Sequence, residues 1–119
     1  MRRSAFAAVL LSGAVVFAAA PAGAGSGPVK RTVKLGDNYF SPTKLTVNRD
    51  STITWRWPED SGDVHDVALG KRPAGVKQFA SDPASTSYSF KRKLTKPGRY
   101  SIICTLHEEE MRMTVTVRR

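Results

Sequence analysis

The sequence predicts a small all-β protein, built as a two-sheet antiparallel β-sandwich of about seven short strands. Three observations predict this fold class. Apolar and polar residues alternate with a period of two in many short stretches, and β-branched and aromatic residues fill the apolar positions. Turn residues such as Gly, Pro, Asn and Asp separate these stretches. After the N-terminal region, no ten-residue stretch shows helical periodicity, and 119 residues provide for one domain.

The N-terminal 24 residues have the pattern of a secretory signal peptide. Arg2 and Arg3 are followed by an apolar run over residues 5–20 and by small residues suited to a peptidase. We expect cleavage after Ala24, with Ala20 as the alternative, which leaves residues 25–119 as the exported domain. An uncleaved membrane anchor is the competing interpretation, but the run is short for a full span. The arginine pair leaves both the general secretory and the twin-arginine routes open.

The strands follow from the alternation in chain order. The clearest is "TITWRW", in which Ile53, Trp55 and Trp57 face one way and are expected in the core. "GDN" and "TKPG" are expected to be turns, and the last strand places Met113 inward beside two valines. The expected strands cover residues 29–35, 44–47, 52–57, 64–69, 86–90, 99–104 and 112–117.

The chain is basic, with a formal net charge of +9, and removal of the leader arginines leaves +7. Such a balance suits an acidic partner or an anionic surface. The basic residues are scattered through strands and turns, and aromatic residues do not interleave them in a stripe. We therefore expect no nucleic-acid partner.

Cys104 is the only cysteine of the chain. Export implies an oxidising compartment, where paired cysteines would stabilise a small domain. A single cysteine cannot pair within the chain. It is therefore a buried inert thiol, an intermolecular bridge, a reactive group or a metal ligand.

Four residues point to the last of these choices. Cys104 ends a strand, His107 and Met111 follow in the next loop, and His65 lies on an earlier strand with inward parity. A sandwich can bring these groups together at one end. One thiolate, two imidazoles and a weak axial thioether form the blue-copper type of electron-transfer site, whereas structural zinc sites use paired Cys/His spacings that are missing here. Met113 is the rival axial ligand, but its parity favours the core.

Four segments resemble the small cupredoxins of the plastocyanin/amicyanin/pseudoazurin type: "YFSPTKLTV", "STITWRW", "DVHDV" and "PGRYSIICTLHEEEMRMTVTV". Together they span most of residues 35–118. The resemblance implies a Greek-key β-sandwich of seven to eight strands with one copper ion. It also implies that the ligands are His65, Cys104, His107 and Met111.

The sequence departs from the family pattern at several positions. Asp66 stands where the family often has an asparagine that helps to tie the ligand loops together, and we expect either that role or an ordinary turn residue. Glu108–Glu110 replace apolar or small residues beside His107, on a face that often docks redox partners. An ordinary solvated loop is the simplest interpretation, and a positively charged partner or a copper-loading contact would also fit them. Met113 stands where a glycine often occurs.

We therefore expect an exported, monomeric blue-copper protein that passes single electrons between redox partners and is not an enzyme. Two histidines cannot supply the additional copper centres of a multicopper enzyme. A copper carrier or storage module of the cell envelope is the second hypothesis, and a metal-free structural sandwich is the third. The expected location is the periplasm, the cell envelope or the extracellular space, without stable membrane insertion after cleavage.

Overall fold

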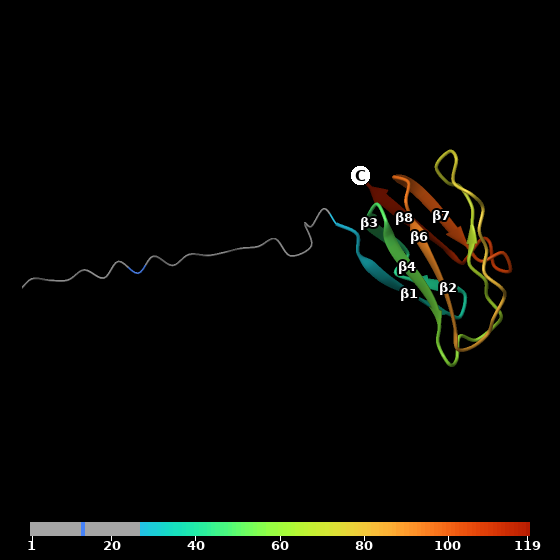
Figure 1. Ribbon diagram of the computed structural model, residues 1–119. Helices are drawn as coiled ribbons and strands as arrows, with labels where there is room; N and C mark the ends of the chain where they lie inside the picture. Colours follow the sequence, from blue (N-terminus) through green and yellow to red (C-terminus); the bar gives the residue numbers. More distant parts are fainter. Residues whose placement is uncertain (1–12, 14–26) are drawn as a thin grey trace, which may run out of the picture.

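The structure, a computed structural model, describes Gly13 and residues 27–119. Within this part of the chain there are eight strands and no helix, in agreement with the predicted all-β class (Figure 1). The strands are β1 Lys30–Gly36, β2 Tyr39–Ser41, β3 Lys44–Asn48, β4 Ser51–Trp57, β5 Ala68–Leu69, β6 Tyr88–Leu94, β7 Gly98–Ile103 and β8 Arg112–Arg118.

The strands form two four-stranded sheets, in the orders β2-β1-β4-β6 and β3-β8-β7-β5. Most neighbours are antiparallel, as expected, but each sheet also contains one parallel pair, β1 with β4 and β3 with β8. The sheets are therefore mixed. Both parallel pairs arise because the chain crosses to the other sheet between the two partners. Alternation in a sequence identifies the inward face of a strand but not the direction of its neighbour.

The strand boundaries differ from expectation at three places. β2 forms immediately after the turn at Asp37 and was not expected as a strand. β6 was expected to end at Phe90 but continues to Leu94. Arg92 can occupy an inward-facing position of this strand because its guanidinium lies over the rings of Phe79 and Phe90, at 5.5 and 4.3 Å from their centroids. The expected strand over 64–69 is reduced to two residues, and His65 forms only an isolated bridge with Ala84.

The core lies between the two sheets and is rich in aromatic side chains. Trp55 and Trp57 are fully buried, as the alternation predicted. Trp55 packs against Phe79 and Phe90 with ring centroids about 6 Å apart. Burial of each large apolar side chain contributes about 2 kcal/mol. The eight strands and this core lie within residues 27–119, so this part of the chain forms both sheets of the sandwich.

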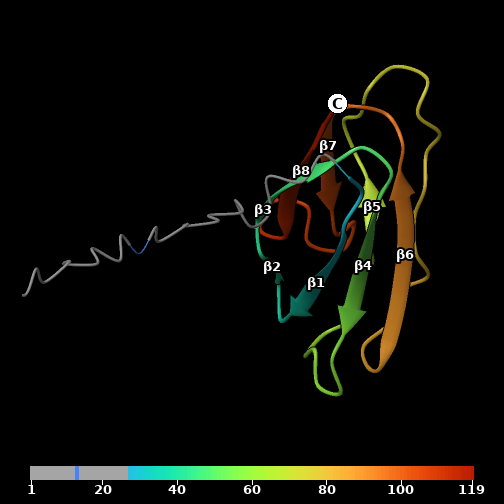
Figure 2. The ribbon, with the colours of Figure 1, turned by 60° about the vertical axis from the view of Figure 1, so that its left-hand side comes forward.

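The two ends of the sandwich differ, and we name them here. At the site end, β4 and β7 finish and β8 begins. At the distal end, β1 and β4 begin, and β6 and β8 finish. Figure 2 shows the distal end at the top, where the chain terminus, the turn between β3 and β4 and the end of β6 lie together.

Residues 1–12 and 14–26 lie outside the described part of the chain, so the leader over 1–24 and the domain boundary at residue 25 stay predictions. Among the described residues, no helix is long and apolar enough to cross a membrane.

Candidate metal centre

Three side chains from two distant segments converge at the site end. One ligand atom each from His65, Cys104 and His107 lies within 4.8 Å of the others. The Cys104 sulfur lies 3.6 Å from Nδ1 of His107, and the two imidazole rings are 5.1 Å apart between centroids. His65 and Cys104 are fully buried. The fold therefore brings together the thiol and both imidazoles that the sequence singled out.

In both histidines, Nε2 lies near an oxygen atom, whereas Nδ1 does not. Nε2 of His65 lies 3.0 Å from the carbonyl oxygen of Ser61 and 3.7 Å from the Asp37 carboxylate. Its Nδ1 is buried and has no hydrogen-bond partner. In His107, Nδ1 faces the cysteine sulfur, while Nε2 lies 3.6 Å from Asp63. An Nε2–H that donates to an oxygen leaves Nδ1 as a lone pair, which is the usual arrangement of a metal-binding imidazole.

The orphaned Nδ1 of His65 tests whether the site fits a metal. Buried polar atoms almost always have a partner, because an unpaired one costs about 1–3 kcal/mol. A metal ion coordinated at this nitrogen would remove that cost. A thiol and two imidazoles are also the donors that copper prefers, so the residues present fit copper.

The loop after β7 is folded by its own backbone hydrogen bonds. The Cys104 N–H donates to the Met111 carbonyl at 3.1 Å, and the His107 N–H donates to the Cys104 carbonyl at 3.1 Å. The Met111 N–H donates to the His107 carbonyl at 2.9 Å. These three bonds close the loop on itself and hold the His107 ring beside the sulfur.

Asp66 joins this loop to the segment that carries His65. Its carboxylate accepts a hydrogen bond from the Thr105 N–H at 2.7 Å and another from the Thr105 hydroxyl. The side chain is 7% exposed. These two bonds link the segment that follows His65 to the loop that follows Cys104.

The family follows from a comparison of the sequence with known families. Residues 28–118 match the family described as copper binding proteins, plastocyanin/azurin family. The chain belongs to this family. Its cofactor is therefore copper, and His65, Cys104 and His107 are positioned as one possible copper site.

Solved structures of small cupredoxins share this fold. Amicyanin from Paracoccus versutus is 21% identical, with 80% of this chain and 94% of that chain covered and a TM-score of 0.64. A pseudoazurin from Sinorhizobium meliloti is 20% identical, with 76% and 75% covered and a TM-score of 0.61. A copper-containing nitrite reductase from Thermus scotoductus is 24% identical with a TM-score of 0.63, but this chain covers only 23% of its length.

Trp57 supports the site of this cupredoxin in a way that the sequence did not reveal. Its indole N–H donates to the His65 carbonyl oxygen at 3.1 Å, and the ring packs edge-on against Tyr88. The sequence identified Trp57 only as a core residue. The residue type could have indicated this hydrogen bond, because a buried indole N–H usually finds an acceptor.

Burial raises the pKa of the Cys104 thiol. The N–H groups of Asp66 and Leu106, which favour the thiolate, oppose this effect, and the negative charge of Asp66 adds to it. The metal-free cupredoxin therefore holds this sulfur as a thiol at neutral pH. A metal ion that binds there must displace the proton.

The two methionines near the last strand have different surroundings. Met111 is fully buried and immediately precedes β8 at the site end. Met113 lies within β8, and its sulfur accepts a hydrogen bond from the Trp55 indole at 3.4 Å. The Met113 sulfur is thus engaged in the core.

The loops at the site end carry both exposed apolar and exposed acidic side chains. The His107 side chain is 20% exposed. The exposed large apolar side chains of the described residues, Tyr39, Val64 and Leu106, all belong to segments at this end. The same loops carry the exposed acidic residues Asp37, Asp63, Glu108, Glu109 and Glu110. We call this surface the acidic face.

Proposed function

We propose that this protein is a mononuclear blue-copper electron carrier, in which His65, Cys104 and His107 bind copper and Met111 is the weak axial ligand. One observation carries the proposal: three soft or borderline donors meet within 4.8 Å, two of them fully buried and the third at the surface. Copper would supply a one-electron Cu(II)/Cu(I) couple in this ligand set.

The residues around the ligands keep the site rigid. Ser61 and Asp37 hold one imidazole, Asp66 holds the loop that follows Cys104, and Trp57 holds the backbone of His65. Fixed ligands change position little between oxidation states, so an electron can transfer without large rearrangement. The buried sulfur is also shielded from water and from oxidants.

The position of His107 supports a route for the electron through this ring. Since Cys104 and His65 are buried, the His107 ring is the proposed ligand that reaches the surface, beside Asp63 of the acidic face. Apolar contact can bring a partner close to that ring, and the carboxylates favour a partner with a basic rim. We propose a redox protein of this charge as the partner, with this chain acting as a monomer.

A carrier role also accounts for the lack of further catalytic groups in the sequence. The chain has two histidines, and both belong to the proposed copper site, so turnover is assigned to the partners and not to this chain. The leader predicted over residues 1–24 places this activity outside the cytoplasm, in the periplasm, the cell envelope or beyond.

The decisive experiment is the addition of Cu(II) to purified protein while the visible spectrum is recorded. The expected result is intense blue absorption from charge transfer between thiolate and copper, complete at one equivalent, and absent in Cys104→Ser. A colourless protein that gains no stability from copper would instead indicate a metal-free structural sandwich.

A second measurement separates an electron carrier from a copper carrier. The pre-formed, buried site favours slow exchange of copper with a chelator and fast electron self-exchange. Rapid loss of copper to a moderate chelator, together with slow self-exchange, would assign the protein to copper delivery or storage.

The acidic face can be tested with matched charge changes. Glu108→Gln with Glu110→Gln removes two charges from it, while Asp50→Asn with Asp82→Asn removes two charges elsewhere. The first pair should slow reduction by a basic haem protein several-fold at low salt, and the second pair should not. Equal effects would show that net charge, and not this face, controls docking.

A further inference from the structure

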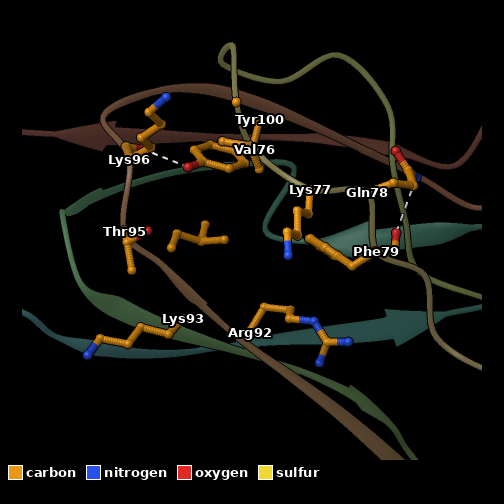
Figure 3. Close-up of a pocket in the computed structure, with 11 residues that line it drawn as sticks. Val76, Lys77, Gln78, Phe79, Arg92, Lys93, Thr95, Lys96 and Tyr100 are labelled. Carbon is orange, nitrogen blue, oxygen red and sulfur yellow. Dashed lines mark hydrogen bonds between the residues drawn. The ribbon is translucent and has the colours of Figure 1, made fainter.

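The distal end of the sandwich carries two adjoining grooves that the copper site does not use. The first groove, of about 400 Å³, lies between the loop over residues 75–79 and the end of β6 (Figure 3). The second, of about 460 Å³, lies between the β3–β4 turn and the chain terminus. Lys96 lines both, so they form one continuous surface.

This surface is strongly cationic, and we call it the basic end. Its cations are Arg49, Lys77, Arg92, Lys93, Lys96 and Arg119. No Asp or Glu side chain lines either groove.

The opposite charge is collected at the site end. Eight of the ten acidic residues lie in the loops there: Asp37, Glu59, Asp60, Asp63, Asp66, Glu108, Glu109 and Glu110. The molecule is therefore a charge dipole along the strand direction. A dipole of this kind orients a protein against a charged surface before any contact is made.

The backbone of the basic end is fastened in place, while some of its charges extend freely into solvent. The Tyr100 hydroxyl donates to the Lys96 carbonyl at 2.7 Å, and the Lys96 ammonium donates to the Ala74 carbonyl. These bonds connect the β6–β7 turn to the neighbouring loop. The side chains of Lys77 and Lys93 are exposed and make no hydrogen bond or ion pair within the described part of the chain.

The chain enters the domain at this same end. The Asn48 side chain donates to the Gly27 carbonyl at 2.8 Å, and the Val29 N–H donates to the Ser51 hydroxyl at 3.0 Å. The apolar run over residues 5–20 therefore joins the domain through a short linker next to Arg49. While that run lies in a membrane, the basic end is the part of the domain held closest to it.

We propose that the basic end docks on an anionic phospholipid bilayer, as a peripheral contact without insertion, so that the acidic face points away from the membrane. Clusters of Lys and Arg next to a bilayer bind anionic headgroups through their summed charge. The aromatic rings do not favour nucleic acid, since Tyr100 is 1% exposed and Phe79 is covered by Arg92. Bases therefore find no stacking surface here.

The test uses residues 25–119, which contain both sheets of the sandwich and lack the apolar run. The protein is sedimented at low salt with vesicles of phosphatidylcholine alone or with phosphatidylglycerol added. Binding is expected only to the anionic vesicles, and it should disappear at high salt. A short single-stranded oligonucleotide serves as the alternative polyanion.

Two matched variants locate the contact. Lys77→Glu with Lys93→Glu reverses two charges at the basic end, and Lys34→Glu with Arg56→Glu reverses two paired, exposed charges near the site end. The first variant should bind anionic vesicles at least about tenfold more weakly, and the second should change binding by less than about threefold.

Three results would overturn the proposal: no binding of the wild type to anionic vesicles, equal losses in both variants, or tighter binding to the oligonucleotide. Circular dichroism checks that both variants keep the β-sandwich. The copper site takes no part in this test, so its outcome is independent of the proposed electron-carrier function.

Discussion

Asp66 and Thr105, 39 positions apart in the sequence, are joined by two hydrogen bonds that end on the same carboxylate. One bond comes from the backbone N–H and the other from the hydroxyl of Thr105. The residues next to this pair are His65 on one side and Cys104 on the other. The pair therefore fixes the separation of the two segments that supply the metal donors, which neither segment could fix alone.

The first prediction concerns this link. Asp66→Ala should lower the free energy of unfolding of the metal-free protein by about 2–3 kcal/mol, because two hydrogen bonds to a buried carboxylate are lost. Thr105→Val removes only the hydroxyl donor and should cost about 1 kcal/mol. Both values come from urea unfolding. If Asp66→Ala unfolded at the wild-type urea concentration, the link would be structurally unimportant.

The second prediction separates the two methionines. Met111→Leu should keep the blue colour and raise the reduction potential, since a weak axial sulfur donor is lost. Met113→Leu should leave the potential unchanged and cost about 1 kcal/mol of stability, because the Trp55 indole loses its acceptor. Voltammetry and urea unfolding measure the two effects. A shift of the potential in Met113→Leu alone would reverse the assignment.

The third prediction is a pH dependence of the metal-free protein. Burial raises the pKa of Cys104 above the ordinary thiol value of 9.0, so the unfolded chain loses this proton before the folded protein does. The contribution of the thiol to stability is thus fully present below pH 9 and decreases above it, by at most about 1.4 kcal/mol per pH unit.

Cys104→Ser is the control for this pH dependence, and it should remove that part of the decline. Burial also raises the pKa of Tyr100, so measurements below pH 10 isolate the thiol. A wild type and a serine variant with identical pH profiles would contradict the prediction.

The fourth prediction concerns the exposed edge of the site. Asp63 lies 3.6 Å from Nε2 of His107, where its negative charge favours the oxidised, more positive centre. Asp63→Asn should raise the reduction potential by roughly tens of millivolts, a small effect because the carboxylate is 69% exposed and therefore screened. Asp50→Asn, a matched change at the distal end of the sandwich, should leave the potential unchanged.

The central strands could be predicted because their alternation is unbroken. Ile53, Trp55 and Trp57 are buried as the period of two required, and β8 follows the same pattern. β2 could not be predicted in this way, since three residues are too few to show a period. The full length of β6 could not be predicted, because the charged Arg92 interrupts the inward-facing apolar positions of this strand. In the structure, the Arg92 guanidinium lies over the rings of Phe79 and Phe90.

The donor set was already present in the sequence, which has one cysteine, two histidines and a nearby methionine in a family-like order. The sequence by itself determined the all-β class and the types of donor, because both depend on residue identity and spacing along the chain. Only the tertiary structure decided which nitrogen of each histidine faces the site, that Trp57 supports His65, and that Asp66 connects the two segments. It also showed that six basic residues from separate segments line two grooves at one end, while most acidic residues lie in loops at the other. These relationships join positions far apart in the chain, and local alternation carries no information about which distant residues become neighbours.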